Sequence, residues 1–173
     1  SPKTVMGQSK ALCEWIVETW GHRADVATQF VAVRFGNVLN SSGSVIPIFR
    51  RQIAKGGPVT VTHPEMTRFF MTIPEAVQLI VQAGAIGGRG QVYVLDMGEP
   101  VKMVQLAQDL IKLSGLTEQD VPIVYSGTRN GEKLAEALFD AGMETQPTSH
   151  PEVLRVVGAD ACATSDIHGL VWQ

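Results

Sequence analysis

The spacing of apolar and polar residues predicts a chain of alternating helices and strands. Val5, Leu12 and Ile16 recur at helical intervals and Gly21 follows as a stop signal, so we expect a helix over residues 4–20. Pro74 stands where a first-turn proline belongs and predicts another helix start. The same criteria predict the remaining helices, which cover 45–55, 74 to 84 or 87, 102–114 and, as a short helix, 132–139.

Short apolar runs between these helices predict strands. The run Phe-Val-Ala-Val at 30–33 lacks the alternation of a half-buried strand and is typical of a parallel strand buried on both faces. Three more strands are expected, at 59–61, within 91–98 and within 121–127. The residues that follow show little periodicity and are expected to be irregular. This alternation of elements predicts an α/β fold with parallel pairing.

Composition narrows the function classes. The chain has 173 residues, 45% of them hydrophobic, and a net charge of −3, which fits one soluble globular domain. The charges form no basic tract, so we expect no nucleic-acid partner. The 2 cysteines form no CxxC pair, which predicts no metal site and a reducing, cytoplasmic location. No apolar run reaches the roughly 20 residues of a membrane span, so we expect no membrane contact by this chain.

The usual dinucleotide-binding motif is missing from the sequence. Such a motif consists of a strand, a Gly-rich turn and a helix whose N-terminus holds the pyrophosphate. No G-x-G-x-x-G follows any predicted strand, and Gly127 and Gly131 do not fit that spacing. By itself, the chain is therefore not expected to hold a dinucleotide in the usual way.

Four motifs in order resemble the bacterial polysaccharide-biosynthesis nucleotide-sugar 4,6-dehydratases, which are extended short-chain dehydrogenases/reductases acting on substrates of the UDP-GlcNAc type. The motifs are VMGQSK at 5–10, VRFGNVLNSSGSVIPIF at 33–49, TRFFMTIPEAVQLI at 67–80 and TRNGEKLAEALF at 128–139. The resemblance implies the carboxy-terminal half of a Rossmann-like fold, with parallel strands, flanking helices and a small substrate-binding subdomain. It further implies that the Gly-rich amino-terminal half is absent here, that residues 1–157 carry the catalytic helix and substrate site, and that 158–173 form an irregular tail.

The first motif departs from the common pattern of these enzymes. Most short-chain dehydrogenases carry Tyr-x-x-x-Lys on one helix, whereas this chain has Met6-x-x-x-Lys10. A thioether has no proton to exchange at neutral pH, so Met6 cannot do the work of the tyrosine. The pattern resembles that of large membrane-anchored dehydratases of this family, which implies Lys10 as a catalytic and nicotinamide-ribose-binding residue beside Met6. The alternative is that Met6 is a core side chain and Lys10 a solvated surface charge.

The second motif supplies the expected cofactor and substrate contacts. The resemblance places Phe35 and Asn37 near the nicotinamide, and Asn37 also against the substrate's phosphates, beyond the carboxyl end of a strand where ligands of open α/β sheets bind. The alternative is that Asn37 is a turn residue in an unusual backbone conformation. The residues expected to flank the uracil, although their helical spacing is equally typical of core residues, are Val45, Ile46 and Phe49.

Two arginines are expected to bind the diphosphate. Arg68 in the third motif and Arg129 in the fourth each present a planar guanidinium that matches phosphate oxygens. The family usually shows Arg-Pro-Gly-Glu where this chain has Arg-Asn-Gly-Glu at 129–132, which keeps the charge but makes the loop less preorganised. Glu132 is expected to meet a ribose hydroxyl or to brace Arg129. Each arginine, considered alone, is also typical of a surface residue.

The resemblance implies a reaction for the full-length enzyme. Hydride passes from C4 of the hexose to NAD or NADP, water is lost across C5 and C6, and the hydride returns to C6. We expect no turnover by the isolated chain. The alternatives are a UDP-sugar 4-epimerase on the same scaffold, which Met6 disfavours, and a non-catalytic sugar-nucleotide-binding module. Because strands that lack their neighbours expose edges, we also expect homo-oligomers.

Overall fold

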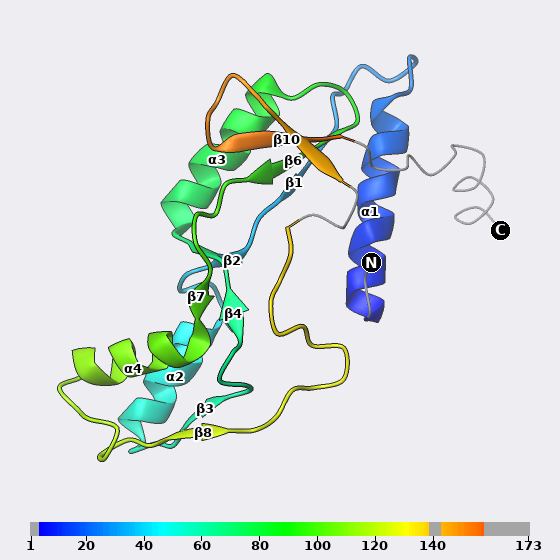
Figure 1. The fold of residues 1–173 in the computed structure, drawn as a ribbon. Helices are drawn as coiled ribbons and strands as arrows, with labels where there is room; N and C mark the ends of the chain where they lie inside the picture. The colour runs from blue at the N-terminus through cyan, green and yellow to red at the C-terminus, as the bar shows by residue number, and fades with distance from the viewer. Residues whose placement is uncertain (1–3, 139–142, 158–173) are drawn as a thin grey trace. The chain divides into compact units, whose positions relative to one another are not determined.

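The computed structural model describes residues 4–138 and 143–157 and divides into two compact units. We call them the sheet unit, comprising residues up to 35, 77–96 and from 138 onward, and the pocket unit, comprising 36–76 and 97–137. The helices, drawn in Figure 1, are α1 (Val5–Gly21), α2 (Val45–Ala54), α3 (Ile73–Ile86) and α4 (Met103–Leu113). The predicted tail at 158–173 lies outside the described residues.

The strands are mostly short. Those of the sheet unit are β1 (Val31–Arg34), β6 (Gln91–Leu95), β9 (Glu144–Pro147) and β10 (Val153–Val157). Those of the pocket unit are β2 (Asn37–Val38), β3 (Val59–Val61), β4 (Thr67–Arg68), β5 (Phe70–Met71), β7 (Val101–Lys102) and β8 (Ile123–Tyr125).

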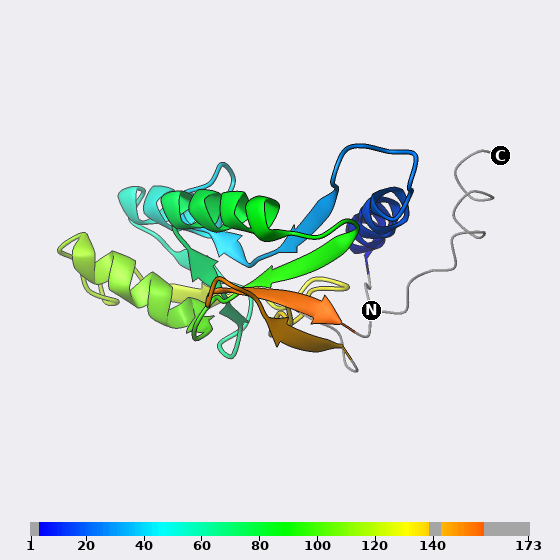
Figure 2. The ribbon, with the colours of Figure 1, turned by 90° about the horizontal axis from the view of Figure 1, so that it is seen from above.

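The sheet unit contains a four-stranded sheet of order β1-β6-β10-β9, whose strands lie side by side in Figure 2. β1 pairs with β6 in parallel, with Val31 opposite Gln91, while β10 runs antiparallel to β6 and to β9. β6 is the buried centre, because its residues Val92–Leu95 are covered on both faces. Within the described strands, β1 has a neighbour on one side only. β1 therefore has an unpaired edge of the kind that we expected to promote self-association. Self-association itself stays a prediction.

α1 packs against β1 and β6 and is the helix that carries Met6 and Lys10. It begins after Thr4, whose hydroxyl accepts a hydrogen bond from the Gly7 N–H at 3.1 Å and thus caps the first turn. It ends at Gly21, a buried residue that lies against Gly90 in the turn before β6. The start of the helix is therefore determined by local sequence, whereas the glycine at its end also permits a close tertiary contact.

The pocket unit has its own apolar core. α2 and α4 pack on each other and on β3, which pairs in parallel with β8. The core residues are Ile46, Phe49, Ile53, Val59, Val61, Met66, Met103, Ala107, Leu110, Ile111 and Val121. Residues of the short strands and loops, among them Leu39 and Phe70, pack against this core.

Two predictions of local structure are wrong. The stretch predicted as a helix at 132–139 is irregular over its described residues, 132–138, and Ala135 forms an isolated bridge with Thr67. The stretch predicted as irregular after it contains β9 and β10, which pair with each other and extend the sheet beyond β6. Ala135 bridges to the distant Thr67 and β10 pairs with the distant β6, contacts of which local periodicity carries no record.

Burial of β1 also differs from the prediction. Val31–Arg34 are all half-buried rather than fully covered on both faces. The position at the sheet edge is the physical reason, because an edge strand is covered by neighbours on one side only.

Glu18, in the C-terminal half of α1, allows a prediction of pH dependence. Burial raises the pKa of its carboxyl, the Glu14 carboxylate raises it further, and Arg34 and His22 lower it. Because the folded-state pKa lies above the unfolded one, ionised Glu18 costs stability at neutral pH, and that cost disappears as the pH falls below the unfolded pKa. Glu18→Gln is expected to raise Tm at about pH 7, with the gain vanishing near pH 4.

Thermal unfolding across that pH range, with the exposed Glu144→Gln variant as a control, tests this expectation. A gain in Tm that stays constant from neutral to acidic pH would contradict it.

Candidate functional site

Met6 and Lys10 lie one turn apart on α1, near its N-terminal end. Met6 is 73% exposed, and Lys10 is exposed as well. The alternative that Met6 is a core side chain is therefore wrong. The Ser9 hydroxyl donates to the Met6 carbonyl at 2.8 Å, a local contact within the helix. Both side chains are available to a ligand, and Phe35, directly after β1, is 37% exposed in the same unit.

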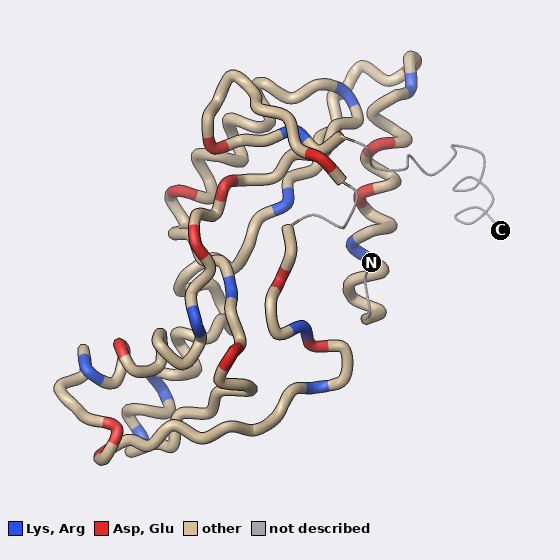
Figure 3. Tube along the Cα trace, in the orientation of Figure 1, with Lys and Arg blue, Asp and Glu red and all other residues tan. Residues whose placement is uncertain are grey.

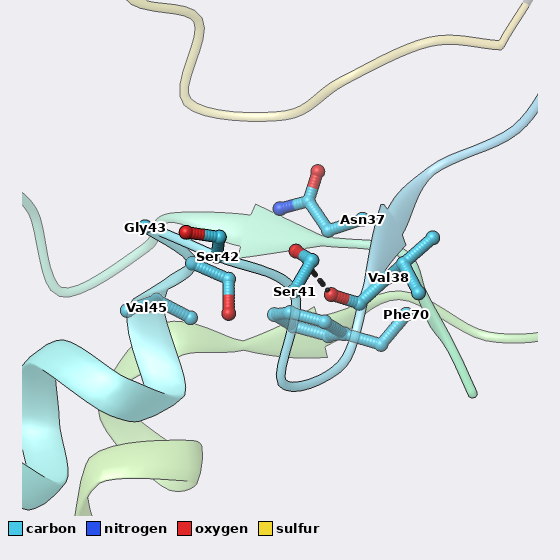
Figure 4. A pocket seen from close by; sticks show the side chains of 8 residues that line it. Asn37, Val38, Ser41, Ser42, Gly43, Val45 and Phe70 are labelled. Atoms are coloured by element: carbon cyan, nitrogen blue, oxygen red, sulfur yellow. Dashed lines mark hydrogen bonds between the residues drawn. The ribbon is translucent and has the colours of Figure 1, made fainter. Parts of the chain in front are cut away.

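A pocket of about 390 Å³ opens in the pocket unit where β2 leads toward α2. Its lining consists of Asn37, Val38, Ser41, Ser42, Gly43, Ser44, Val45 and Phe70. Figure 4 shows the Asn37 amide and the hydroxyls of Ser41 and Ser42 around the opening, with the Phe70 ring at its base. The Ser41 hydroxyl donates to the Val38 carbonyl at 2.8 Å, which fixes the turn. The pocket is thus polar at its rim and apolar below.

Asn37 is held by strand pairing. It lies in β2 opposite Phe70 of β5, and its N–H donates to the Phe69 carbonyl at 2.8 Å. The positive φ values in this loop belong to Asn40, at 59°, and to Gly43, at 75°. The alternative interpretation of Asn37 as a turn residue of unusual backbone is therefore wrong, and its side chain is presented to the pocket from a fixed backbone.

The N-terminus of α2 forms one wall of the pocket. Ser44 occupies the N-cap position, yet its side chain makes no capping hydrogen bond. Its Oγ is buried and has no partner among the described residues. The free N–H groups of a helix start attract anions, because they carry the positive end of the helix dipole. A phosphate at this end of the pocket would meet the N–H groups of Val45 and Ile46, whereas Pro47 has none to offer.

The three residues expected to flank the uracil are divided by the fold. Val45 lines the pocket, whereas Ile46 and Phe49 are 8% and 2% exposed and belong to the core of the pocket unit. Their helical spacing is that of core residues, the alternative that the sequence left open. Of these three residues, Val45 is therefore the one whose side chain is placed to contact a base in the pocket.

Arg68 is surrounded by acceptors. Its side chain is 11% exposed and makes ion pairs with Glu136 (Nε to Oε1, 3.2 Å) and Glu132 (Nη2 to Oε1, 3.9 Å). Its Nη1 donates to the carbonyls of Thr67 at 2.7 Å and Leu134 at 3.2 Å. The guanidinium thus holds the irregular 132–136 segment against β4. Glu136 is the partner that the sequence reasoning missed, because a helix was predicted there.

Arg129 and Glu132 form the turn of the fourth motif. The Glu132 carboxylate accepts a hydrogen bond from the Arg129 backbone N–H at 3.1 Å, and the Glu132 N–H donates to the Arg129 carbonyl at 3.0 Å. Glu132 thus braces the Arg129 backbone, one of its two expected roles. The Arg129 side chain is exposed. Of the two expected phosphate ligands, Arg129 presents its charge to solvent and Arg68 has its charge largely neutralised.

Charges of both signs are distributed through each unit, as Figure 3 shows. Within residues 4–138 and 143–157, no group of three or more His, Cys, Asp or Glu side chains is arranged to hold a metal ion. The helices in these ranges also include none with the length and apolarity that a membrane crossing requires.

Comparison with known proteins adds a family match. A family model described as polysaccharide biosynthesis protein matches residues 1–158. The capsular polysaccharide biosynthesis protein CapD of Staphylococcus aureus is 58% identical over 140 residues, which are 81% of this chain and 23% of that protein. A UDP-glucose 4-epimerase of Rickettsia canadensis is 38% identical over 142 residues, 81% of this chain and 40% of the epimerase. The chain thus spans less than half the length of either relative.

A solved structure shares the fold. DesIV, a dTDP-glucose 4,6-dehydratase from Streptomyces venezuelae with NAD and TYD bound, matches with a TM-score of 0.68 and 21% identity. The match covers 80% of this chain and 43% of DesIV. This likeness confirms the predicted fold class, α/β and Rossmann-like, with this chain corresponding to less than half of the solved chain.

Proposed function

Because the chain belongs to the polysaccharide biosynthesis protein family, we propose that it is the substrate-binding half of a nucleotide-sugar-modifying enzyme, a UDP-sugar 4,6-dehydratase that uses NAD or NADP. The observation that carries the proposal is the pocket between β2 and α2. The Asn37 amide, the Ser42 hydroxyl and an uncapped helix start meet there, a set of donors suited to the phosphates of a sugar nucleotide.

In this proposal, hydrogen-bond donors and one positive charge of the pocket unit bind the diphosphate. Asn37 and the N-terminus of α2 donate to its oxygens, and Arg129 supplies the exposed positive charge. Glu132 holds the Arg129 backbone in place. Arg68 becomes a phosphate ligand when the diphosphate displaces Glu136, its close exposed partner. The base then lies along Val45, on the apolar side of the opening.

On α1, Lys10 is the residue suited to the nicotinamide ribose, because its ammonium is exposed and donates hydrogen bonds. The cofactor, when bound, supplies reversible hydride acceptance. Met6 carries no exchangeable proton, so it shapes the site sterically and the proton steps at C4, C5 and the leaving hydroxyl fall to groups outside α1. Loss of water becomes feasible once C4 is a ketone, since the ketone acidifies the proton at C5.

A UDP-sugar 4-epimerase is the second candidate function, and the likeness to the Rickettsia canadensis epimerase favours it. Both reactions start by oxidising C4, so the dehydratase is favoured by the resemblance of the Met6-x-x-x-Lys10 motif to dehydratases that carry methionine at the tyrosine position. Product analysis of the full-length enzyme separates the two, since the dehydratase forms a 4-keto-6-deoxy sugar and the epimerase a C4 epimer. A non-catalytic module would bind the sugar nucleotide and form neither.

Arg129→Ala is expected to weaken binding of UDP-N-acetylglucosamine by about 10- to 100-fold, because one charge-assisted contact to the diphosphate is lost. Calorimetric titration of the purified protein measures the effect. Arg50→Ala, which removes an exposed arginine on the α2 face outside the pocket lining, serves as the matched control and should bind normally. Equal affinity of Arg129→Ala and the unsubstituted protein would refute the assigned role of Arg129.

A further inference from the structure

One charged pair joins the helix that carries Lys10 to the strand that precedes Phe35. Arg34, the last residue of β1, presents both sides of its guanidinium to Glu14 of α1. Nε lies 2.7 Å from Oε1, and Nη2 pairs with Oε2. The two side chains are 22% and 17% exposed, so water screens the pair less than it would a surface ion pair. This is a bidentate contact in a largely covered place.

Arg34 is also held from its other side. Its Nη1 donates to the Leu138 carbonyl at 3.4 Å and lies 3.5 Å from the Met143 sulfur. These contacts all lie within the sheet unit. The guanidinium plane therefore has a defined orientation, which a single contact to a flexible carboxylate would not impose.

The Glu14–Arg34 pair follows directly after the part of α1 that has no fully buried residue. Every residue from Val5 to Cys13 keeps part of its surface exposed, and Val5 and Met6 are 83% and 73% exposed. Glu14 follows one turn after Lys10 on the same face of the helix. Because apolar burial anchors the first half of α1 weakly, a bidentate contact at Glu14 sets the rotation and position of the turns that carry Met6 and Lys10.

We propose that Glu14 and Arg34 are positioning residues, which fix Lys10 relative to the end of β1, where Phe35 follows directly. This inference rests on the proposed function, since it assigns the pair a role toward the nicotinamide-binding lysine. Neither side chain needs to touch substrate or cofactor. Their effect passes through the placement of α1, and misplacement of a reacting group by about 1 Å is enough to cost about 100-fold in rate.

The test uses the full-length enzyme with three variants. Glu14→Gln removes the charge, Arg34→Lys keeps the charge but loses the planar fork, and the third variant combines Glu14→Gln with Arg34→Met. The matched control is Asp25→Asn, which breaks the exposed Arg23–Asp25 pair of the same unit, whose side chains are 38% and 64% exposed. Steady-state kinetics and thermal unfolding are measured for each.

Each single substitution is expected to lower kcat by about 10- to 100-fold, while KM for the sugar nucleotide stays within about twofold. The double variant should be no slower than the slower single one, because the two residues act as one unit. Asp25→Asn should match the unsubstituted enzyme. Wild-type kcat in both single variants at a temperature well below their Tm, or a change in KM alone, would overturn the positioning role.

Amide hydrogen exchange keeps this inference separate from the proposed function. If the unsubstituted enzyme turns over no UDP-sugar, the proposed function fails, and the pair is then judged by exchange in residues 5–13. Exchange there is expected to accelerate by about tenfold in Glu14→Gln and Arg34→Lys and to be unchanged in Asp25→Asn. Unchanged exchange in all three variants would overturn the claim that the pair holds α1.

Discussion

Alanine at Gly21 is expected to destabilise the protein by about 3 kcal/mol or more, because the added Cβ has no room. It would lie 2.2 Å from the Gly90 nitrogen and 2.3 Å from the Gly90 Cα. Both are backbone atoms, so no side-chain rotation relieves the overlap. Gly90 cannot move away easily, since its N–H donates to the Phe30 carbonyl at 2.9 Å. The end of α1 would separate from the turn before β6.

Denaturant unfolding of Gly21→Ala measures the loss. Gly84→Ala is a matched control in α3, because no described atom outside its own stretch of helix lies within 4 Å of where its Cβ would be. Alanine is favoured over glycine in a helix, so the control should gain up to about 1 kcal/mol. A loss below about 1 kcal/mol for Gly21→Ala would show that the close approach of the two glycines does not govern the packing of α1.

Lys10→Met in the full-length enzyme is expected to lower kcat by about 100-fold, because the nicotinamide loses a contact that positions it against C4 of the sugar. Methionine keeps the length of the side chain and removes its charge and hydrogen-bond donors. Because Lys10 is exposed on α1, the substitution should leave Tm nearly unchanged. Steady-state kinetics with a UDP-sugar, together with thermal unfolding, measure both quantities.

Lys112→Met removes an exposed lysine from the last turn of α4 and is the matched control. Its kcat should equal that of the unsubstituted enzyme. If Lys10→Met retains kcat within about threefold, Lys10 is a solvated surface charge and the alternative interpretation of the first motif is correct.

The four long helices could be predicted from sequence because their signals are local. Helix α1 was expected at 4–20 and spans Val5–Gly21, and the helix opened by Pro74 is α3, which begins at Ile73. A threonine cap and a first-turn proline act on the backbone within one turn, so they need no distant partner. The buried strand β6 could also be predicted from sequence, since its apolar run reflects coverage on both faces.

The candidate site was predictable only in part. The motifs singled out residue types suited to a diphosphate, namely Asn37, Arg68, Arg129 and Glu132. They did not show which of the charged side chains are already paired with other residues of the chain. Arg68 proves to be paired with Glu136, which the predicted helix at 132–139 had hidden. Ile46 and Phe49 belong to the core, whereas Val45, adjacent in sequence, lines the pocket. Helical spacing cannot separate these roles, because a core-facing and a pocket-facing residue can be neighbours on one turn.

By itself, the sequence determined the order of helices and main strands, the α/β class and the residues from which a site can be built, because each of these depends on neighbours a few positions away. Only the tertiary structure decided the pairing of β10 with β6, the coverage of β1 and the contact of Glu14 with Arg34. These depend on residues far apart in the chain that meet after folding. Hydrogen bonding and charge pairing at that range leave no periodic trace in the sequence, since they are selected by geometry in three dimensions.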